Sequence, residues 1–137
     1  VGLAVVASSL KLDEGALRSG TAYCSDLKNV EGTHYTVAVE AGTPPQNFDL
    51  VIDTGSSNVI IESCECRATK FCEESNKCFE SKQSSTLQIA GANQGPETVV
   101  LMFGSGPIET VISTDVVRMG DVAVTLEKGL FLMRDQM

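Results

Sequence analysis

The short segment Asp53-Thr54-Gly55-Ser56 combines residue types that can do acid-base chemistry. It follows an apolar stretch from Phe48 to Ile52, so Asp53 stands where a buried strand would end. An ionised carboxylate is costly to bury unless hydrogen-bond donors face it, and the hydroxyls and the close-approaching backbone of the next three residues provide such donors. The structural alternative is that Asp53 caps a turn, as Asp and Ser often do. The segment therefore predicts a carboxylate site, but three letters alone do not establish catalysis.

Four of the five cysteines, Cys64, Cys66, Cys72 and Cys78, lie within fifteen consecutive positions of a polar stretch. Their spacings, C-x-C, C-x5-C and C-x5-C, do not form the paired knuckles that are typical of structural zinc sites. Disulfides are therefore favoured over a metal site or free thiols, and they would place the chain in an oxidising compartment. Cys24 is left over, either free or paired with a cysteine outside this sequence. We expect no metal and no cofactor.

Short runs rich in Val, Ile, Thr and Leu alternate with Gly, Pro, Asn and Ser, which predicts an all-β chain without a dominant helix. The alternation from Thr33 to Glu40 predicts a strand with Tyr35, Val37 and Val39 on one face. The stretch from Gly42 to Asn47 predicts a turn, after which the chain returns as the strand that leads to Asp53. Further strands are expected at Asn58–Ile61, Glu97–Phe103, Ile108–Ile112, Asp115–Arg118, Asp121–Leu126 and Gly129–Met133, and a surface loop at Cys64–Phe79.

The N-terminal part of the chain is harder to assign. Val1 to Ala7 is apolar and predicts a strand, although the tail of a signal peptide or a propeptide remnant would have a similar composition. Residues 11–32 support no firm assignment. A chain of 137 residues is expected to bury a single core.

The composition argues against several classes of function. Apolar residues make up 42% of the chain and charged residues 20%, as in ordinary folded domains. The net charge of -8, without a cluster of Lys or Arg, argues against a nucleic-acid partner. No apolar run approaches the roughly 20 residues that span a bilayer, so no membrane segment is expected in this chain.

A longer pattern surrounds the Asp53 motif. Gly42-Thr43-Pro44-Pro45-Gln46, then Phe48, then Val51 to Asn58, resemble the active-site region in the N-terminal lobe of the pepsin family of aspartic proteases. Phe79 and Ser84-Ser85-Thr86 resemble the F-x4-S-S-T stretch that follows this region in the family. The resemblance thus extends well beyond three letters.

The resemblance continues toward the C-terminal end of the chain. Phe103-Gly104-Ser105-Gly106 falls where the family carries its flap, and Ser113-Thr114-Asp115 resembles the G-x-D segment after it. Within the family, Glu31 to Val37 looks most like β-secretase. The cysteine-rich loop looks more like nepenthesin-type plant enzymes or parasite plasmepsins, and the two likenesses leave the subgroup open.

The resemblance implies that residues 33–137 are part of the N-terminal lobe of a bilobal, all-β acid protease, with a flap hairpin near 97–112. Residues 1–32 would be an N-terminal segment. It also implies that Asp53 is one of two carboxylates that share a proton and activate a water for peptide-bond hydrolysis.

The same resemblance assigns supporting roles. Ser56 would hydrogen-bond Asp53, Thr54 would contact the second lobe, and Gly55 would let the backbone come close to the carboxylate. The residues that cover an extended peptide or protein substrate would be Phe103, Gly104 and Ser105.

Three features depart from the family pattern. Phe103 and Ile60 stand where the family usually has Tyr and Trp, so an orienting hydrogen bond of the flap would be missing. There is no second D-T-G or D-S-G, and Asp115 lacks a following Gly, which indicates a structural residue. The apolar-apolar-Gly element of the family is not recognisable before Met137, so we expect the lobe to be incomplete at its C-terminal end.

Two functions are therefore weighed. In the first, the chain supplies one catalytic Asp to an aspartic endopeptidase, and a C-terminal lobe on the same polypeptide or on a separate chain supplies the other, with a second copy of the chain as a less favoured source. In the second, the chain is a non-catalytic peptide-binding or structural subunit. Either would suit the secretory pathway, the extracellular space or an acidic vesicle or vacuole, and the enzyme would be made as a zymogen.

Overall fold

The computed structural model describes residues 3–4, 25–55, 58–68, 72, 77–91, 93–103 and 106–136. Within these ranges the chain is almost entirely β, as predicted, and nine strands form one sheet. The helical turns α2 (Cys64–Ala68) and η1 (Ser81–Gln83) are short. The strands are β1 (Leu3–Ala4), β2 (Leu27–Val30), β3 (His34–Ala41), β4 (Gln46–Ile52), β5 (Val59–Glu62), β6 (Gln88–Ile89), β7 (Thr98–Phe103), β8 (Gly106–Met119) and β9 (Val122–Gln136).

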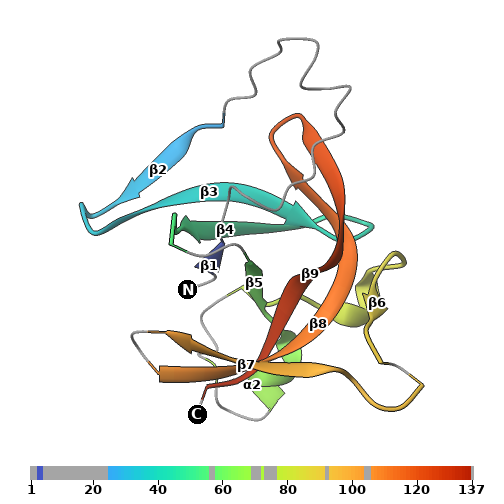
Figure 1. Cartoon of the computed structure of the whole chain (residues 1–137). Coiled ribbons are helices and arrows are strands. Elements are labelled where there is room, and N and C mark those ends of the chain that lie inside the picture. The colour runs from blue at the N-terminus through green and yellow to red at the C-terminus, as the bar shows by residue number, and fades with distance from the viewer. Residues whose placement is uncertain are drawn as a thin grey trace.

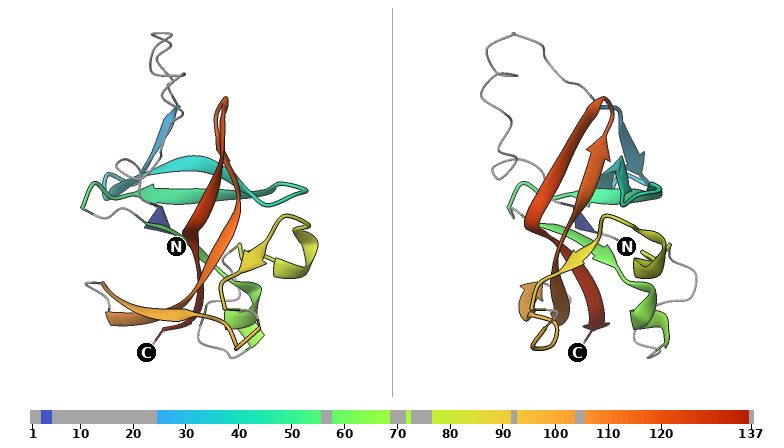
Figure 2. Two further views of the ribbon diagram at one scale, coloured as in Figure 1. Left: turned by 45° about the vertical axis from the view of Figure 1, so that its right-hand side comes forward. Right: turned by 90° about the vertical axis from the view of Figure 1, so that its right-hand side faces the viewer.

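The sheet curves so far that its early strands meet its late ones. The strand order is β2-β3-β4-β1-β5-β9-β8-β6, and β7 pairs with β8. Strand β3 also pairs with β8, where Ala41 lies opposite Val117. The long strands β8 and β9 consequently run steeply across β3 and β4 (Figures 1 and 2).

The hydrophobic core is built by strands from both parts of this curved sheet. Val37 and Val39 of β3 are 1% and 5% exposed, in agreement with the face predicted from their alternation. Tyr35 is 51% exposed, because β4 pairs with β3 only from Thr36 onward and the outer end of β3 extends beyond the core. The other core members are Ala41, Phe48, Leu50, Ile61, Phe79, Val111, Val117, Leu130 and Leu132.

The turn between β3 and β4 lies where the sequence predicts it. Gly42 has a φ of 86°, a conformation that residues with a Cβ rarely adopt. A Cβ at this position would also lie 3.0 Å from Cβ and Oγ of Ser84. The backbone N–H of Gly42 donates to the carbonyl of Val116 at 2.9 Å, which attaches the turn to β8. Residue 42 must therefore be Gly for two reasons, its backbone dihedral and its closeness to Ser84.

The strands expected after the flap are longer than predicted. Ile108–Ile112 and Asp115–Arg118 both belong to β8, and Asp121–Leu126 and Gly129–Met133 both belong to β9. A shift in the β8–β9 register between Ser113 and Asp115 absorbs the residues that look like strand breaks, Thr114 in β8 and Glu127 to Gly129 in β9. Because β-bulges allow a strand to continue past such positions, the prediction of four separate strands was wrong.

The prediction that Cys64–Phe79 is a surface loop also needs correction. The segment begins with α2, and both Cys66 and Phe79 are 0% exposed. Phe79 is anchored by the backbone, since its N–H donates to the carbonyl of Glu62 at 2.7 Å and its carbonyl accepts from Cys64 at 3.0 Å. Its ring packs against Phe48 with centroids 6.3 Å apart. The described part of the segment therefore contributes to the core.

Replacing Gly42 by Ala should destabilise the fold by about 2–3 kcal/mol, because strain at positive φ adds to the clash with Ser84. Gly32 is the matched control, since its φ is 74° but nothing lies within 4 Å of a Cβ there. Gly32→Ala should cost about 1 kcal/mol from the dihedral alone. Urea unfolding of the whole protein measures both costs, and equal midpoints for the two variants would contradict the steric argument.

Candidate active site

Asp53 lies directly after β4, at the start of the loop that leads to β5. Strand β4 pairs with β3 on one side and with β1 on the other. In β1, Ala4 lies opposite Ile52 of β4 and opposite Val59 of β5. Because β1 lies between β4 and β5, both ends of the loop that carries Asp53 are fixed to the same strand.

The Asp53 carboxylate is half-buried and is contacted by its own loop. Its Oδ1 accepts a hydrogen bond from the backbone N–H of Gly55 at 2.9 Å. A Cβ on residue 55 would lie 3.2 Å from the same oxygen, tighter than an ordinary van der Waals contact. Gly55 therefore leaves room for this approach, and a hydrogen bond to an ionised acceptor is worth about 1.5–3 kcal/mol. Thr54 is exposed, and Ser56 lies outside the described residues.

Strands β7 and β8 form an antiparallel hairpin over the residues expected to form the flap. Phe103 ends β7, is half-buried and lies opposite Gly106 of β8. Gly104 and Ser105 lie outside the described residues. Ile60, which stands where the family usually has Trp, is 3% exposed in β5 and lies opposite Phe131 of β9. Ile60 therefore packs as an interior side chain.

A second carboxylate, that of Asp115 on β8, is completely buried and well provided with donors. Ser84 donates its hydroxyl to Oδ2 at 2.7 Å, and Thr86 donates its hydroxyl to Oδ1 at 2.5 Å. The backbone N–H of Val116 donates to Oδ1 at 2.7 Å. These contacts satisfy a group that would otherwise be costly to bury. The geometry agrees with a structural role for Asp115 and explains the S-S-T stretch as its donor segment.

Ser84 and Thr86 also hold the turn that precedes β4. The backbone N–H of Thr43 donates to Ser84 Oγ at 3.1 Å, and the hydroxyls of Thr43 and Thr86 lie 2.9 Å apart. The start of β4 is thus attached to β8 through Asp115, and the other end of β4 leads into Asp53.

Comparison with known proteins agrees with this arrangement of motifs. Residues 34–130, more than half of the chain, match the family described as Eukaryotic aspartyl protease. The chain belongs to this aspartyl protease family. The matched range begins at β3 and ends within β9, so it contains Asp53, the β7–β8 hairpin and Asp115.

Relatives of this aspartyl protease chain come from animals and plants. Renin from Echis ocellatus is 37% identical over 114 residues, which cover 83% of the chain and 27% of that protein. Pepsin-2B from Gadus morhua is 37% identical over 69% of the chain and 27% of its own length. Aspartic proteinase oryzasin-1 from Oryza sativa subsp. japonica is 32% identical over 93% of the chain and 28% of its own length. The chain therefore spans less than a third of the length of these relatives.

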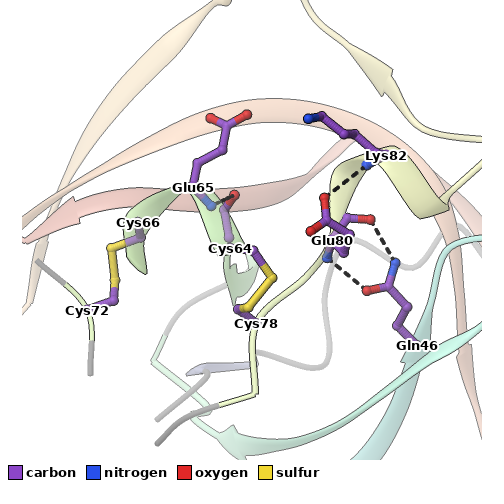
Figure 3. Close-up of a disulfide and its surroundings, with 9 residues drawn as sticks. Gln46, Cys64, Glu65, Cys66, Cys72, Cys78, Glu80 and Lys82 are labelled. Carbon is purple, nitrogen blue, oxygen red and sulfur yellow. Dashed lines mark hydrogen bonds between the residues drawn. A yellow bond between two sulfur atoms is a disulfide. The ribbon is translucent and has the colours of Figure 1, made fainter. Parts of the chain in front are cut away.

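The four clustered cysteines form two disulfides, as predicted. Cys64 pairs with Cys78 and Cys66 with Cys72, with Cα atoms 4.9 and 5.5 Å apart (Figure 3). The sequence left this pairing open. Both bonds join α2 to the residues after it. Cys24 lies outside the described residues, among which no helix is long and apolar enough to cross a membrane.

A polar contact that the sequence did not indicate joins β4 of this aspartyl protease to Glu80, which directly follows the disulfide-bonded segment, residues 64–79. The side-chain amide of Gln46 accepts from the backbone N–H of Glu80 at 2.8 Å and donates to the carbonyl of Glu80 at 3.1 Å (Figure 3). Gln46 is the last residue of the G-T-P-P-Q stretch and the first of β4. The Gln46 side chain therefore makes the two hydrogen bonds to the Glu80 backbone that a neighbouring strand residue would make, at the start of β4.

Ser84→Ala should destabilise the protein by about 2–3 kcal/mol, because the buried Asp115 carboxylate loses a donor. Ser85 is the matched control, since its exposed hydroxyl donates only to the carbonyl of Thr43, at 3.1 Å. Ser85→Ala should cost less than about 1 kcal/mol. Thermal unfolding of the whole protein compares the two variants. Equal melting temperatures would show that Asp115 does not depend on Ser84.

Gln46→Ala should free both backbone groups of Glu80 and loosen that segment locally. We expect amide hydrogen exchange at Glu80 to become at least about tenfold faster, the change expected for an opening free energy lower by about 1.4 kcal/mol. Asn47→Ala changes the exposed neighbour in the same strand and should leave this exchange rate unaltered. Equal protection of Glu80 in both variants would contradict the role of the Gln46 side chain.

Proposed function

We propose that this chain supplies one of the two catalytic carboxylates of an aspartic endopeptidase, and that this carboxylate is Asp53. The observation that carries the proposal is the position of Asp53 at the end of a paired strand, half-buried, with the Gly55 N–H directed at Oδ1 at 2.9 Å. Membership of the aspartyl protease family supports it. Asp115 is a poor candidate, because its carboxylate is buried and saturated with donors.

The proposed chemistry is hydrolysis of a peptide bond by a water held between two carboxylates. The ionised carboxylate takes a proton from this water as its oxygen attacks the scissile carbonyl, and the protonated carboxylate donates to the forming oxyanion. Proton transfer to the leaving nitrogen then completes cleavage. Two carboxylates held this close cannot easily both ionise, so one remains an acid.

The second carboxylate comes from outside these 137 residues. No other D-T-G or D-S-G occurs in the sequence, and the relatives are more than three times longer than the region they share with this chain. A C-terminal lobe on the same polypeptide is the simplest source, because the renin and proteinase relatives are single sequences that contain this region.

The substrate of this enzyme is an extended peptide that lies beneath the β7–β8 hairpin. Phe103 would close over it by apolar packing, without the hydrogen bond that a Tyr hydroxyl could make, which is worth about 1 kcal/mol. The two disulfides favour an oxidising compartment, so we place the protein in the secretory pathway, outside the cell or in an acidic vesicle or vacuole.

The second candidate function is a non-catalytic pepsin-like subunit that binds peptides or serves as a structural subunit. The presence of Phe103 and Ile60 in place of Tyr and Trp favours it, because both positions have lost a polar group. The intact D-T-G-S-S-N segment favours the enzyme, since binding alone does not require Asp53.

Asp53→Asn in the whole protein should lower kcat/KM for a peptide substrate at acidic pH by at least ~1,000-fold, because Asn cannot accept the proton of the attacking water. Asp49→Asn removes an exposed carboxylate from β4, the strand that leads to Asp53, and should leave kcat/KM within about twofold of the wild type. Unchanged cleavage by Asp53→Asn would refute the catalytic assignment. A wild-type protein that binds peptides without cleaving them would support the second candidate.

A further inference from the structure

One face of the β7–β8–β9 sheet remains outside the function proposed above. Val100 and Met102 of β7 are 50% and 74% exposed, and they lie on the same face because they are two residues apart in a strand. Val100 lies opposite Glu109 of β8, which lies opposite Asp135 of β9. Cross-strand partners share a face. We call these four residues the Val100 face.

An open pocket of about 250 Å³ lies further along the same strands. Thr98, two residues before Val100, lies opposite Val111, which lies opposite Leu132. Val111 and Leu132 line the pocket and are only 5% and 2% exposed, so its apolar floor belongs to the core. Ser63, Glu65, Ser81 and Arg134 also line it, so the recess has an apolar floor and a polar rim.

The charges on this face are not balanced within the described residues. Glu109 and Asp135 are like charges directly opposite each other, which is an unfavourable arrangement in a sheet. One carboxylate oxygen of Asp135 is buried and accepts no hydrogen bond from the described residues. Arg134, the cation next to Asp135 in β9, is already engaged with Glu65 at 3.6 Å.

We propose that the Val100 face is a docking surface for an extended polypeptide segment of a partner that is both basic and apolar. One apolar side chain of the segment packs on Val100 and Met102, a second reaches the apolar floor of the pocket, and a Lys or Arg of the segment lies between Glu109 and Asp135. The face repels a second copy of the chain, because a symmetric contact would bring the two acidic pairs together and the chain carries a net charge of -8.

The test uses the whole protein with Asp53→Asn, which prevents cleavage of the probe, and a short fluorescent peptide in which Leu and Lys alternate. The paired change Glu109→Gln with Asp135→Asn should weaken binding at least ~10-fold, and so should Val100→Ser with Met102→Ser. The control pair, Asp121→Asn with Glu127→Gln, removes the same charge from exposed positions just before β9 and in its first half, and should bind like the parent. A peptide in which Leu and Glu alternate should not bind.

Oxidation of Met102 by hydrogen peroxide, mapped by mass spectrometry, checks that the surface is open. Met102 should be converted to the sulfoxide in the protein alone and be protected by the Leu-Lys peptide. Binding that is unaffected by both test pairs would overturn the proposal, since the peptide would then occupy another site, such as the cleft at Asp53. Protection of Met102 in the protein alone, or a dimer in sedimentation that the test pairs dissociate, would also overturn it, because the protein itself would then cover this face.

Discussion

The buried Asp115 carboxylate connects three segments that are far apart in the sequence. Its donors come from Ser84 and Thr86, and these two side chains in turn hold Thr43 in the turn before β4. Removing an ionised group from water costs a large amount of free energy unless such donors are fixed in place. The Asp115 carboxylate therefore requires the turn, the S-S-T segment and β8 to keep one arrangement. Strand β4 starts beside this network and ends at Ile52, directly before Asp53. The carboxylate that we propose to be catalytic is thus positioned by a strand whose first residues are attached to the buried Asp115.

Much of this arrangement could be predicted from the sequence, because it rests on local rules. The alternation of Val37 and Val39 predicts a half-buried strand, and Gly42 before two prolines predicts a turn. Asp53 after an apolar run predicts a carboxylate that backbone donors must face, and the Gly55 N–H is such a donor. The all-β fold, the family and the disulfides were predicted correctly. The roles of Ser56, Gly104 and Ser105 stay predictions, since these residues lie outside the described ranges.

The features that could not be predicted depend on contacts between distant segments. Nothing near Phe79 indicates that it is buried, because its burial comes from Phe48 and from backbone bonds to β5. The length of β8 and β9 depends on bulges, which let polar and glycine positions remain in a ladder. Gln46 looks like an ordinary turn residue until Glu80 is brought beside it by the disulfide-bonded segment. Composition alone also cannot show that Glu109 and Asp135 face each other, because that depends on the register between strands.

The central claim is that Asp53 works as one member of a carboxylate pair. The structure of the whole protein, determined at the acidic pH where we expect activity, tests this most directly. We predict a second Asp, from outside these 137 residues, with its carboxylate about 3 Å from that of Asp53 and a water bound between them. An Asp53 carboxylate that faces only hydrogen-bond donors, with no second carboxylate within reach of a shared water, would contradict the claim and leave a binding or structural subunit.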